Sequence, residues 1–142
     1  MEVVDFLDRL MLAIDDRDYD FARLCLADTV HFDTSSMGGP SRDFTREEMI
    51  AGLQGTFRLL KATQHLLTAP VIDEKSDGTV VCVAQYQAYH YRDGLGDRRL
   101  WVHGGRHHYK LRRLDSGLAV LGLRVEMAWT WGEPSIITAP AG

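Results

Sequence analysis

The sequence lacks several features that would assign its class at once. It has only two cysteines, Cys25 and Cys82, which lie among apolar neighbours without metal-type spacing and indicate buried reduced thiols rather than a disulfide. No apolar run reaches the ~18 residues of a membrane helix, and the acidic N-terminus shows no signal-peptide arrangement. We therefore expect a cytoplasmic protein that makes no contact with a membrane.

An excess of basic charge is also missing. The chain has 16 Lys and Arg against 20 Asp and Glu, a net charge of −4 at pH 7, so it offers no electrostatic footprint for nucleic acid. No repeat, low-complexity tract or linker divides the sequence. We expect a single domain over residues 1–142, a length that buries roughly 68–70% of the unfolded surface without disulfides or metals.

Alternating side chains dominate the second half of the sequence. The pattern follows three long segments, Thr79 to Tyr91, Arg98 to Arg113 and Leu118 to Trp131, which are joined by turn residues. Alternation at period two places one set of side chains on each face of a β-sheet. The set expected to face inwards in the last segment comprises Leu121, Leu123, Val125, Met127, Trp129 and Trp131.

A fourth alternating segment, Gln64 to Asp73, places His65, Leu67, Ala69 and Val71 on its inner side. Helical spacing comes before it: residues 2–16 are amphipathic, a short helix near Tyr19 to Ala27 can be capped by Asp18 or Asp20, and a third helix follows the capping box Thr45 to Glu48. Val30 to Thr34 is predicted as a short strand and Ser35 to Arg42 as a loop that covers a pocket. Together these patterns predict an α+β fold, a cone-shaped barrel in which a strongly curved antiparallel sheet wraps over three N-terminal helices.

A few polar side chains share the apolar inner face. They are Asp15, His65, His90, His103, His107, Tyr86 and Tyr109. One histidine near a core is usually structural, but an acid and several histidines from separate elements are costly to bury, at ~1–3 kcal/mol for each unpaired group. Their spacing matches no known metal site, so we expect neither a metal nor a cofactor. His31 and His108 are predicted at the surface.

Short motifs in a defined order resemble a known family. They run from Ala13-Ile14-Asp15-Asp16-Arg17-Asp18-Tyr19-Asp20 through Phe32-Asp33, Thr63-Gln64-His65 and His90 to Trp131-Gly132-Glu133. This order resembles scytalone dehydratase and its SnoaL-like relatives, members of the nuclear transport factor 2-like superfamily with a cone-shaped α+β fold. No single motif is specific, and the resemblance covers about residues 5–133.

The resemblance implies that Asp15, His65 and His90 fall on a catalytic acid and two catalytic histidines. It also shows departures: the two tyrosines that polarise the substrate carbonyl in scytalone dehydratase appear as Ile14 and Thr34, and its serine and asparagine fall near Gly105 and His107. Scytalone itself is therefore a poor candidate substrate. The acid and histidine pair is also similar to that of the dehydrochlorinase branch of the superfamily.

The function that follows is a cofactor-independent lyase, a dehydratase, acting on a small apolar cyclic or polyketide-like molecule. His65 would remove a proton from carbon, Asp15 would orient His65, and His90 or Tyr86 would protonate the leaving oxygen. An isomerase or cyclase that uses the same proton abstraction is one alternative. A binding protein without chemistry is the other, and the loss of the two tyrosines favours it.

Substrate contacts are expected along the inner face around His65. The predicted substrate-binding residues are Tyr86, Trp101, Gly105, His107, Leu123, Val125 and Met127. The opposite face carries Val81, Val83, Tyr89 and Tyr91, which a monomer would expose to water. An apolar sheet face usually marks a contact, so we expect a homo-oligomer formed through it.

Overall fold

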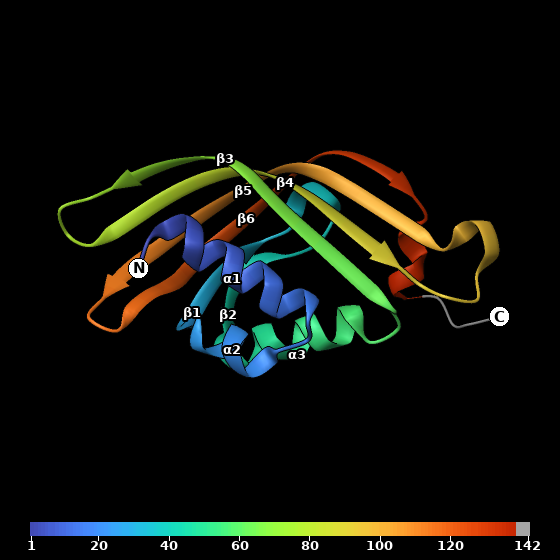
Figure 1. Cartoon of the computed structure of the whole chain (residues 1–142), viewed down its shortest axis with the longest axis horizontal. Helices are drawn as coiled ribbons and strands as arrows, with labels where there is room; N and C mark the ends of the chain where they lie inside the picture. Colours follow the sequence, from blue (N-terminus) through green and yellow to red (C-terminus); the bar gives the residue numbers. More distant parts are fainter. Residues whose placement is uncertain (139–142) are drawn as a thin grey trace.

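A computed structural model describes residues 1–138. Its helices are α1 (Val3–Asp15), α2 (Tyr19–Leu24) and α3 (Arg46–Phe57). Its strands are β1 (Leu26–Asp33), β2 (Ser41–Thr45), β3 (Ala62–Glu74), β4 (Thr79–Tyr91), β5 (Leu100–Leu114) and β6 (Gly117–Gly132). Short 3-10 turns cover Ser35–Met37, Gly96–Arg98 and Pro134–Ile137. The curved sheet arches over all three helices, which lie on its concave side (Figure 1).

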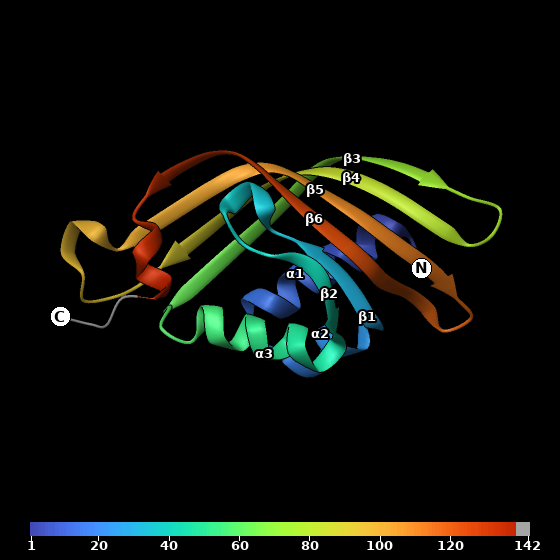
Figure 2. The same cartoon turned by 180° about the vertical axis from the view of Figure 1, so that it is seen from behind.

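The six strands form one sheet in the order β2-β1-β6-β5-β4-β3. All neighbours are antiparallel except β1 and β6, which run parallel (Figure 2). The predicted α+β cone is therefore confirmed, but the sheet is mixed rather than wholly antiparallel. The predicted loop after β1 also contains a strand, β2, which pairs with β1 as an edge.

Local sequence signals fix where the helices begin. The Thr45 hydroxyl accepts a hydrogen bond from the Glu48 amide at 3.1 Å and caps α3, as the capping box predicts. Asp18 caps α2 by accepting from the Phe21 amide at 3.1 Å. The second helix is shorter than predicted, because the chain enters β1 at Leu26.

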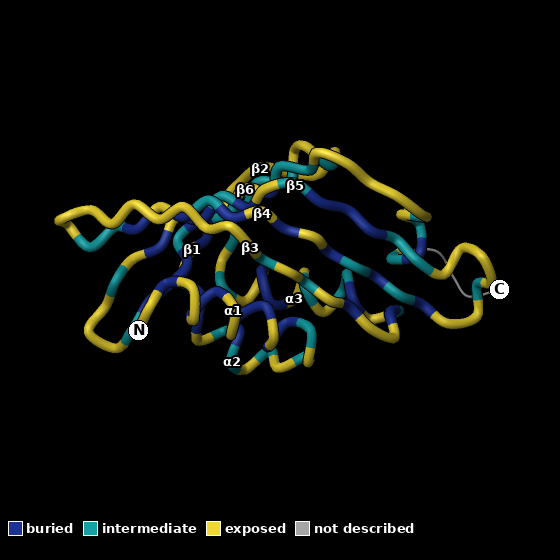
Figure 3. The backbone as a smooth tube through the Cα atoms, turned by 45° about the horizontal axis from the view of Figure 1, so that its top comes forward, coloured by how far each residue is buried: buried dark blue, intermediate teal, exposed yellow. Residues whose placement is uncertain are grey.

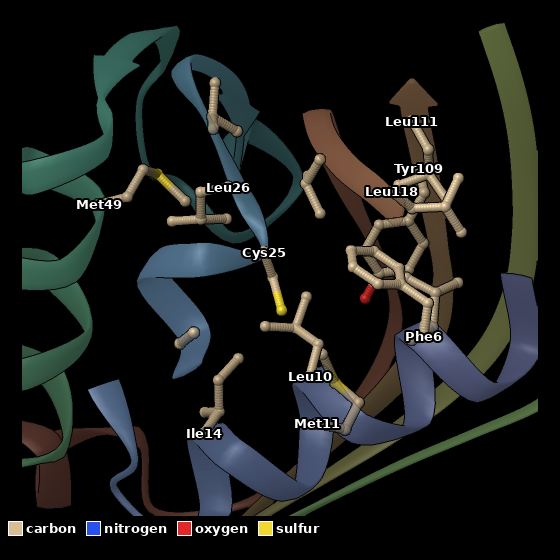
Figure 4. Packing of buried hydrophobic residues seen from close by; sticks show 14 of the residues in the cluster. Phe6, Leu10, Met11, Ile14, Cys25, Leu26, Met49, Tyr109, Leu111 and Leu118 are labelled. Carbon is tan, nitrogen blue, oxygen red and sulfur yellow. The ribbon is translucent and has the colours of Figure 1, made fainter. Parts of the chain in front are cut away.

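One end of the cone is a sealed apolar core. Phe6 and Leu10 of α1 pack towards Tyr109 and Leu111 of β5 (Figure 4). Full burial of such side chains contributes about 1.5–3 kcal/mol each. Both cysteines are buried free thiols, as predicted, and burial raises the pKa of Cys25 to about 11. The Tyr109 hydroxyl is the polar group within this cluster, and it lies 2.8 Å from Nδ1 of His107.

Strand β6 departs from strict alternation at two places. The pairing with β5 skips Leu121 and again Ala128, so each of these is an extra residue in the ladder. An extra residue turns the following side chains to the other face. The inward prediction for Trp129 and Trp131 was therefore wrong: both lie on the outer face, 43% and 65% exposed.

The extra residue at Leu121 also changes which residues of β6 face inwards near the start of the strand. Val120 pairs with the fully buried Leu111 and is itself buried, whereas the predicted inward residue Leu121 is the unpaired one. Strand β3 has a similar irregularity after Thr68, which turns Val71 to the outer face, where it is 72% exposed. Period two holds only while each residue keeps its own partner.

The central strands are the most enclosed part of the sheet. Buried residues recur along the whole length of β4 and β5, while much of the edge strand β3 is exposed (Figure 3). No helix among residues 1–138 is long and apolar enough to cross a membrane. The site described below lies where β3, β4 and β5 pass over the end of α1.

Candidate functional site

Asp15 and His65 form the expected hydrogen-bonded pair. Asp15 ends α1, and its Oδ1 lies 2.7 Å from Nδ1 of His65 on β3. The other carboxylate oxygen accepts the backbone N–H of His65 at 2.9 Å, and the Thr63 hydroxyl donates to Oδ1 at 3.0 Å. Three donors thus converge on one carboxylate and hold it in place. Both side chains are largely enclosed, with 14% of Asp15 and 13% of His65 exposed.

Arg17 and Thr63 support this pair from behind, and the sequence analysis missed both. Nη1 of Arg17 donates to the Thr63 hydroxyl oxygen at 2.7 Å and to the Ile14 carbonyl at 3.0 Å. Because a guanidinium only donates, the Thr63 hydroxyl hydrogen is left for Asp15. Thr63 shares the parity of His65 and could have been found from it. Arg17 could not, because its place depends on a backbone φ of 62° just after α1.

The hydrogen bonds also fix which nitrogen of each histidine carries hydrogen. Nδ1 of His65 faces a carboxylate, and Nδ1 of His90 lies 3.2 Å from the Trp101 carbonyl oxygen. Both partners are acceptors, so both Nδ1 atoms carry hydrogen, and in a neutral ring Nε2 then keeps its lone pair. Burial, together with the neighbouring His65 and His103, lowers the pKa of His90 to about 3. His90 is thus neutral near pH 7 and presents an acceptor.

Aromatic rings enclose the pair. The ring of His90 lies 5.9 Å from that of His65 and stacks on Trp101 at 4.8 Å and on His103 at 5.2 Å. Phe57, at the end of α3, contacts both His65 and His90, at 5.8 and 6.1 Å between ring centres. The predicted catalytic residues therefore meet in one place, and Trp101 lies beside them.

The other predicted substrate-binding residues lie further along the same inner face. Tyr86 stacks on His107 at 4.2 Å and clusters with Val125, against which Leu123 packs. Gly105 pairs with Tyr86 on one side and with Met127 on the other. A Cβ at position 105 would collide with the Glu126 carbonyl, so only glycine fits here.

The loop after β1 is fastened to the same region. The Ser36 hydroxyl donates to the Val125 carbonyl at 2.7 Å and accepts from the Met127 amide at 2.9 Å. These bonds hold the 3-10 turn against β6. Its expected role as a lid stays a prediction.

Neither the larger nor the smaller of two hollows formed by residues 1–138 is lined by Asp15, His65 or His90. The larger, about 510 Å³, lies mainly over the outer face, between Leu66, Gln85, Arg106 and Trp129. The smaller, about 30 Å³, lies between α1 and the strands β3 and β4. The expected apolar cavity beside His65 stays a prediction.

The histidines do not form a metal site. Among residues 1–138, no three His, Cys, Asp or Glu side chains come together in a metal-binding arrangement. His31 and His108 lie outside the site, as predicted, and pair with Asp43 and Glu126. The imidazole and hydroxyl groups of the inner face can transfer protons and form hydrogen bonds.

Comparisons with known proteins agree with this architecture. A family model of the SnoaL-like domain matches residues 1–124. The structure of Kfla4162 from Kribbella flavida is 20% identical over 97% of this chain and 95% of that one, with a TM-score of 0.89. No curated protein sequence matches at a significant level.

Two further structures carry names that describe a reaction. A protein from Novosphingobium aromaticivorans assigned as a scytalone dehydratase is 14% identical, covering 92% of this chain and 84% of that one, with a TM-score of 0.77. A type 2 hexachlorocyclohexane dehydrochlorinase, LinA, is 13% identical, covering 99% and 92%, with a TM-score of 0.76. At these low identities, the TM-scores show a shared fold, the nuclear transport factor 2-like fold. With the family model spanning most of its length, the chain belongs to the SnoaL-like domain family.

Proposed function

We propose that the protein is a cofactor-independent lyase that removes water from a small, largely apolar cyclic or polyketide-like molecule. The observation that carries the proposal is the Asp15–His65 pair, 2.7 Å apart and enclosed by Phe57 and His90. A carboxylate on Nδ1 leaves Nε2 of His65 free to act as a base. Asp15 orients the ring and stabilises the imidazolium that forms.

The elimination balances with His65 alone moving the proton. Nε2 of His65 takes a proton from carbon, the carbon–oxygen bond of a neighbouring hydroxyl breaks as the double bond forms, and the imidazolium returns the proton to the departing oxygen as water. The resting charge of the site is restored. This route needs no second acid.

From their hydrogen bonds we propose that neither His90 nor Tyr86 protonates the leaving oxygen, the role expected from the sequence. Neutral His90 offers a lone pair on Nε2, which suits it to accept a hydrogen bond from the substrate hydroxyl and hold that group in place. The Tyr86 hydroxyl lies 2.8 Å from Nδ1 of His103 and is engaged there. We therefore assign the return of the proton to His65.

The relatives support an elimination without establishing it for this chain. Dehydratase and dehydrochlorinase each describe the loss of a leaving group and a proton. An isomerase or cyclase would use the same base and differ only in the fate of the carbanion. A protein that binds a small molecule without chemistry would not need the oriented base.

Deuterium exchange tests the base before the natural substrate is known. Cyclohexanone in D₂O should exchange hydrogen next to its carbonyl faster with the protein present, and 3-hydroxycyclohexanone should lose water. His65→Ala should lower both rates at least ~10²-fold, the low end for loss of a general base. Nuclear magnetic resonance measures both reactions in one sample.

His31→Ala is the matched control, because His31 also pairs with an aspartate, at 2.8 Å, but on the surface. It should change neither rate. Exchange without loss of water would favour the isomerase or cyclase. Absence of both reactions, or rates that survive in His65→Ala and Asp15→Asn, would overturn the proposal.

A further inference from the structure

His103 and Tyr86 form a second polar pair on the inner face, next to the proposed base. The Tyr86 hydroxyl lies 2.8 Å from Nδ1 of His103, and both side chains are buried, with 3% of Tyr86 and 6% of His103 exposed. Neither residue contacts Asp15. The pair therefore needs an explanation of its own.

The direction of this hydrogen bond follows from what each group can satisfy. Tyr86 has no other hydrogen-bond partner among residues 1–138, so its hydroxyl hydrogen goes to Nδ1 of His103. Burial raises the pKa of Tyr86, which keeps the phenol protonated. His103 then carries its hydrogen on Nε2, since burial and the neighbouring His65 lower its pKa to about 4 and keep the ring neutral.

Nε2 of His103 borders accessible space. This nitrogen has no hydrogen-bond partner among residues 1–138. Every side-chain nitrogen or oxygen there that is fully shielded from solvent does have a partner, so Nε2 of His103 is not fully shielded. The His103 ring stacks on His90 at 5.2 Å and lies 4.6 Å from Trp101. A donor on β5 thus lies beside His90, whose ring in turn contacts that of His65.

His107 forms a similar pair at another place, where its neighbours differ. Its Nδ1 lies 2.8 Å from the hydroxyl of the deeply buried Tyr109, and its ring stacks on Tyr86, the tyrosine that is hydrogen-bonded to His103. It has no ring contact with His90 or Trp101, which are the neighbours of the base. Of the two tyrosine-bound histidines, only His103 adjoins the proposed reaction centre.

We propose that His103 donates a hydrogen bond from Nε2 to a carbonyl oxygen of the substrate, and that Tyr86 is the positioning residue that fixes this tautomer. The inference rests on the proposed function, because a carbon acid next to a carbonyl places negative charge on that oxygen when His65 removes the proton. A pre-oriented neutral donor stabilises this charge without giving up its own proton. The substrate class is then a carbonyl compound with a hydroxyl on the carbon beyond the one that loses the proton.

The tautomer can be measured without any substrate. With ¹⁵N-labelled histidine, His103 should show an unprotonated Nδ1 and a protonated Nε2 at neutral pH. Tyr86→Phe should convert it to a mixture of both tautomers, which a purely structural tyrosine would not do. A wild-type His103 protonated on Nδ1 would overturn the inference, whatever the turnover of the protein.

Contact with the carbonyl is tested with cyclohex-2-enone carrying ¹³C at that carbon. Binding should move the carbonyl resonance downfield in the wild type and in His65→Ala, but not in His103→Ala. His108→Ala, which removes a histidine from the outer face of the same strand, should keep the shift. An equal shift in the wild type and in His103→Ala, or no shift in either, would overturn the inference.

Turnover adds a third readout. On 3-hydroxycyclohexanone, His103→Ala should lower kcat about 10²-fold with little change in KM, because the donor acts mainly in the transition state. His103→Gln, which keeps an N–H donor, should recover part of the loss. Failure of the proposed function would appear as His65→Ala without effect on turnover, whereas failure of this inference would appear as an unchanged rate in His103→Ala.

Discussion

Two histidine–aspartate pairs of nearly equal length lie on different parts of this molecule. His31 and Asp43 face each other across β1 and β2 at 2.8 Å, and His65 and Asp15 meet at 2.7 Å. The side chains of the first pair are 56% and 70% exposed, whereas those of the second are 13% and 14% exposed. Distance alone does not separate them.

The surroundings make the difference. Asp43 offers its carboxylate to water, and an exposed ion pair contributes about 0–1 kcal/mol. Asp15 has exchanged water for three protein donors, and the ring of its partner lies against Phe57 and His90. What distinguishes the candidate site is the burial of its carboxylate and the number of protein groups that donate hydrogen bonds to it.

The largest contrast should appear when each aspartate is replaced by asparagine. Asp15→Asn should lower the free energy of unfolding by about 3 kcal/mol, because an amide cannot accept from every donor around it and leaves buried groups unpaired. Asp43→Asn should cost less than about 1 kcal/mol. Urea titrations at pH 7 measure both, and equal losses would show that the support around Asp15 carries no energy.

Low pH should lower the stability of the protein through the buried histidines of the inner face. Burial lowers the pKa of His107 to about 3, so between about pH 6.5 and that value the unfolded chain binds a proton that the folded chain does not. The free energy of unfolding is therefore highest above about pH 6.5 and decreases as the pH is lowered. At pH 5 this histidine alone should lower it by about 2 kcal/mol. His107→Gln should remove that share of the difference in unfolding free energy between pH 7 and pH 5.

Val30→Ala serves as the control for a loss of stability without a titrating group. Val30 is fully buried, so truncation should cost stability equally at both pH values. A wild-type protein and a His107→Gln variant with the same pH dependence would contradict the neutral, buried state of His107.

The support behind Asp15 should have a smaller effect. Thr63→Val removes the hydroxyl between Arg17 and Asp15 while keeping the shape of the side chain, and one hydrogen bond to a charged group contributes about 1.5–3 kcal/mol. We expect a loss near the lower value, and Thr63→Ser should restore most of it. A Thr63→Ser variant as weak as Thr63→Val would mean that the methyl group, rather than the hydroxyl, matters.

The smallest effect on folding is expected at the outer face, where we propose that a second copy of the chain binds. Trp131 is 65% exposed, and Trp131→Ser should change the free energy of unfolding by less than about 0.5 kcal/mol. It should nevertheless weaken a homo-oligomer measured by light scattering at micromolar concentration. Leu24→Ser, at the 79% exposed apolar residue that ends α2, is the control. A monomeric wild-type protein would refute the oligomer.

Much of the fold could be predicted because its signals are local. The Thr45 cap, the apolar stripe of α1 and the alternation along β4 each depend on residues close in sequence. The Asp15–His65 contact was also within reach, because each residue continues an apolar row of its own element. Such patterns report the environment of a side chain directly.

The remaining features depend on long-range pairing. The parallel contact of β1 with β6 joins residues about 90 positions apart, and nothing in Leu26–Asp33 specifies that neighbour. The extra residues at Leu121 and Ala128 become visible only against the facing strand β5. Arg17 reaches Thr63 through a turn whose conformation the sequence does not announce.

The extra residue at Ala128 decides which side chains at the end of β6 face inwards. Trp129 and Trp131 lie outside and Thr130, which accepts a hydrogen bond from the Trp101 indole at 2.8 Å, lies inside only because Ala128 has no partner on β5. If Ala128 instead paired with Gly104, each later residue of β6 would move by one partner, which would place both indoles on the inner face near His103 and turn the hydroxyl outwards. Whether Ala128 is left unpaired or takes a partner on β5 thus sets which side chains of β6 line this end of the cone.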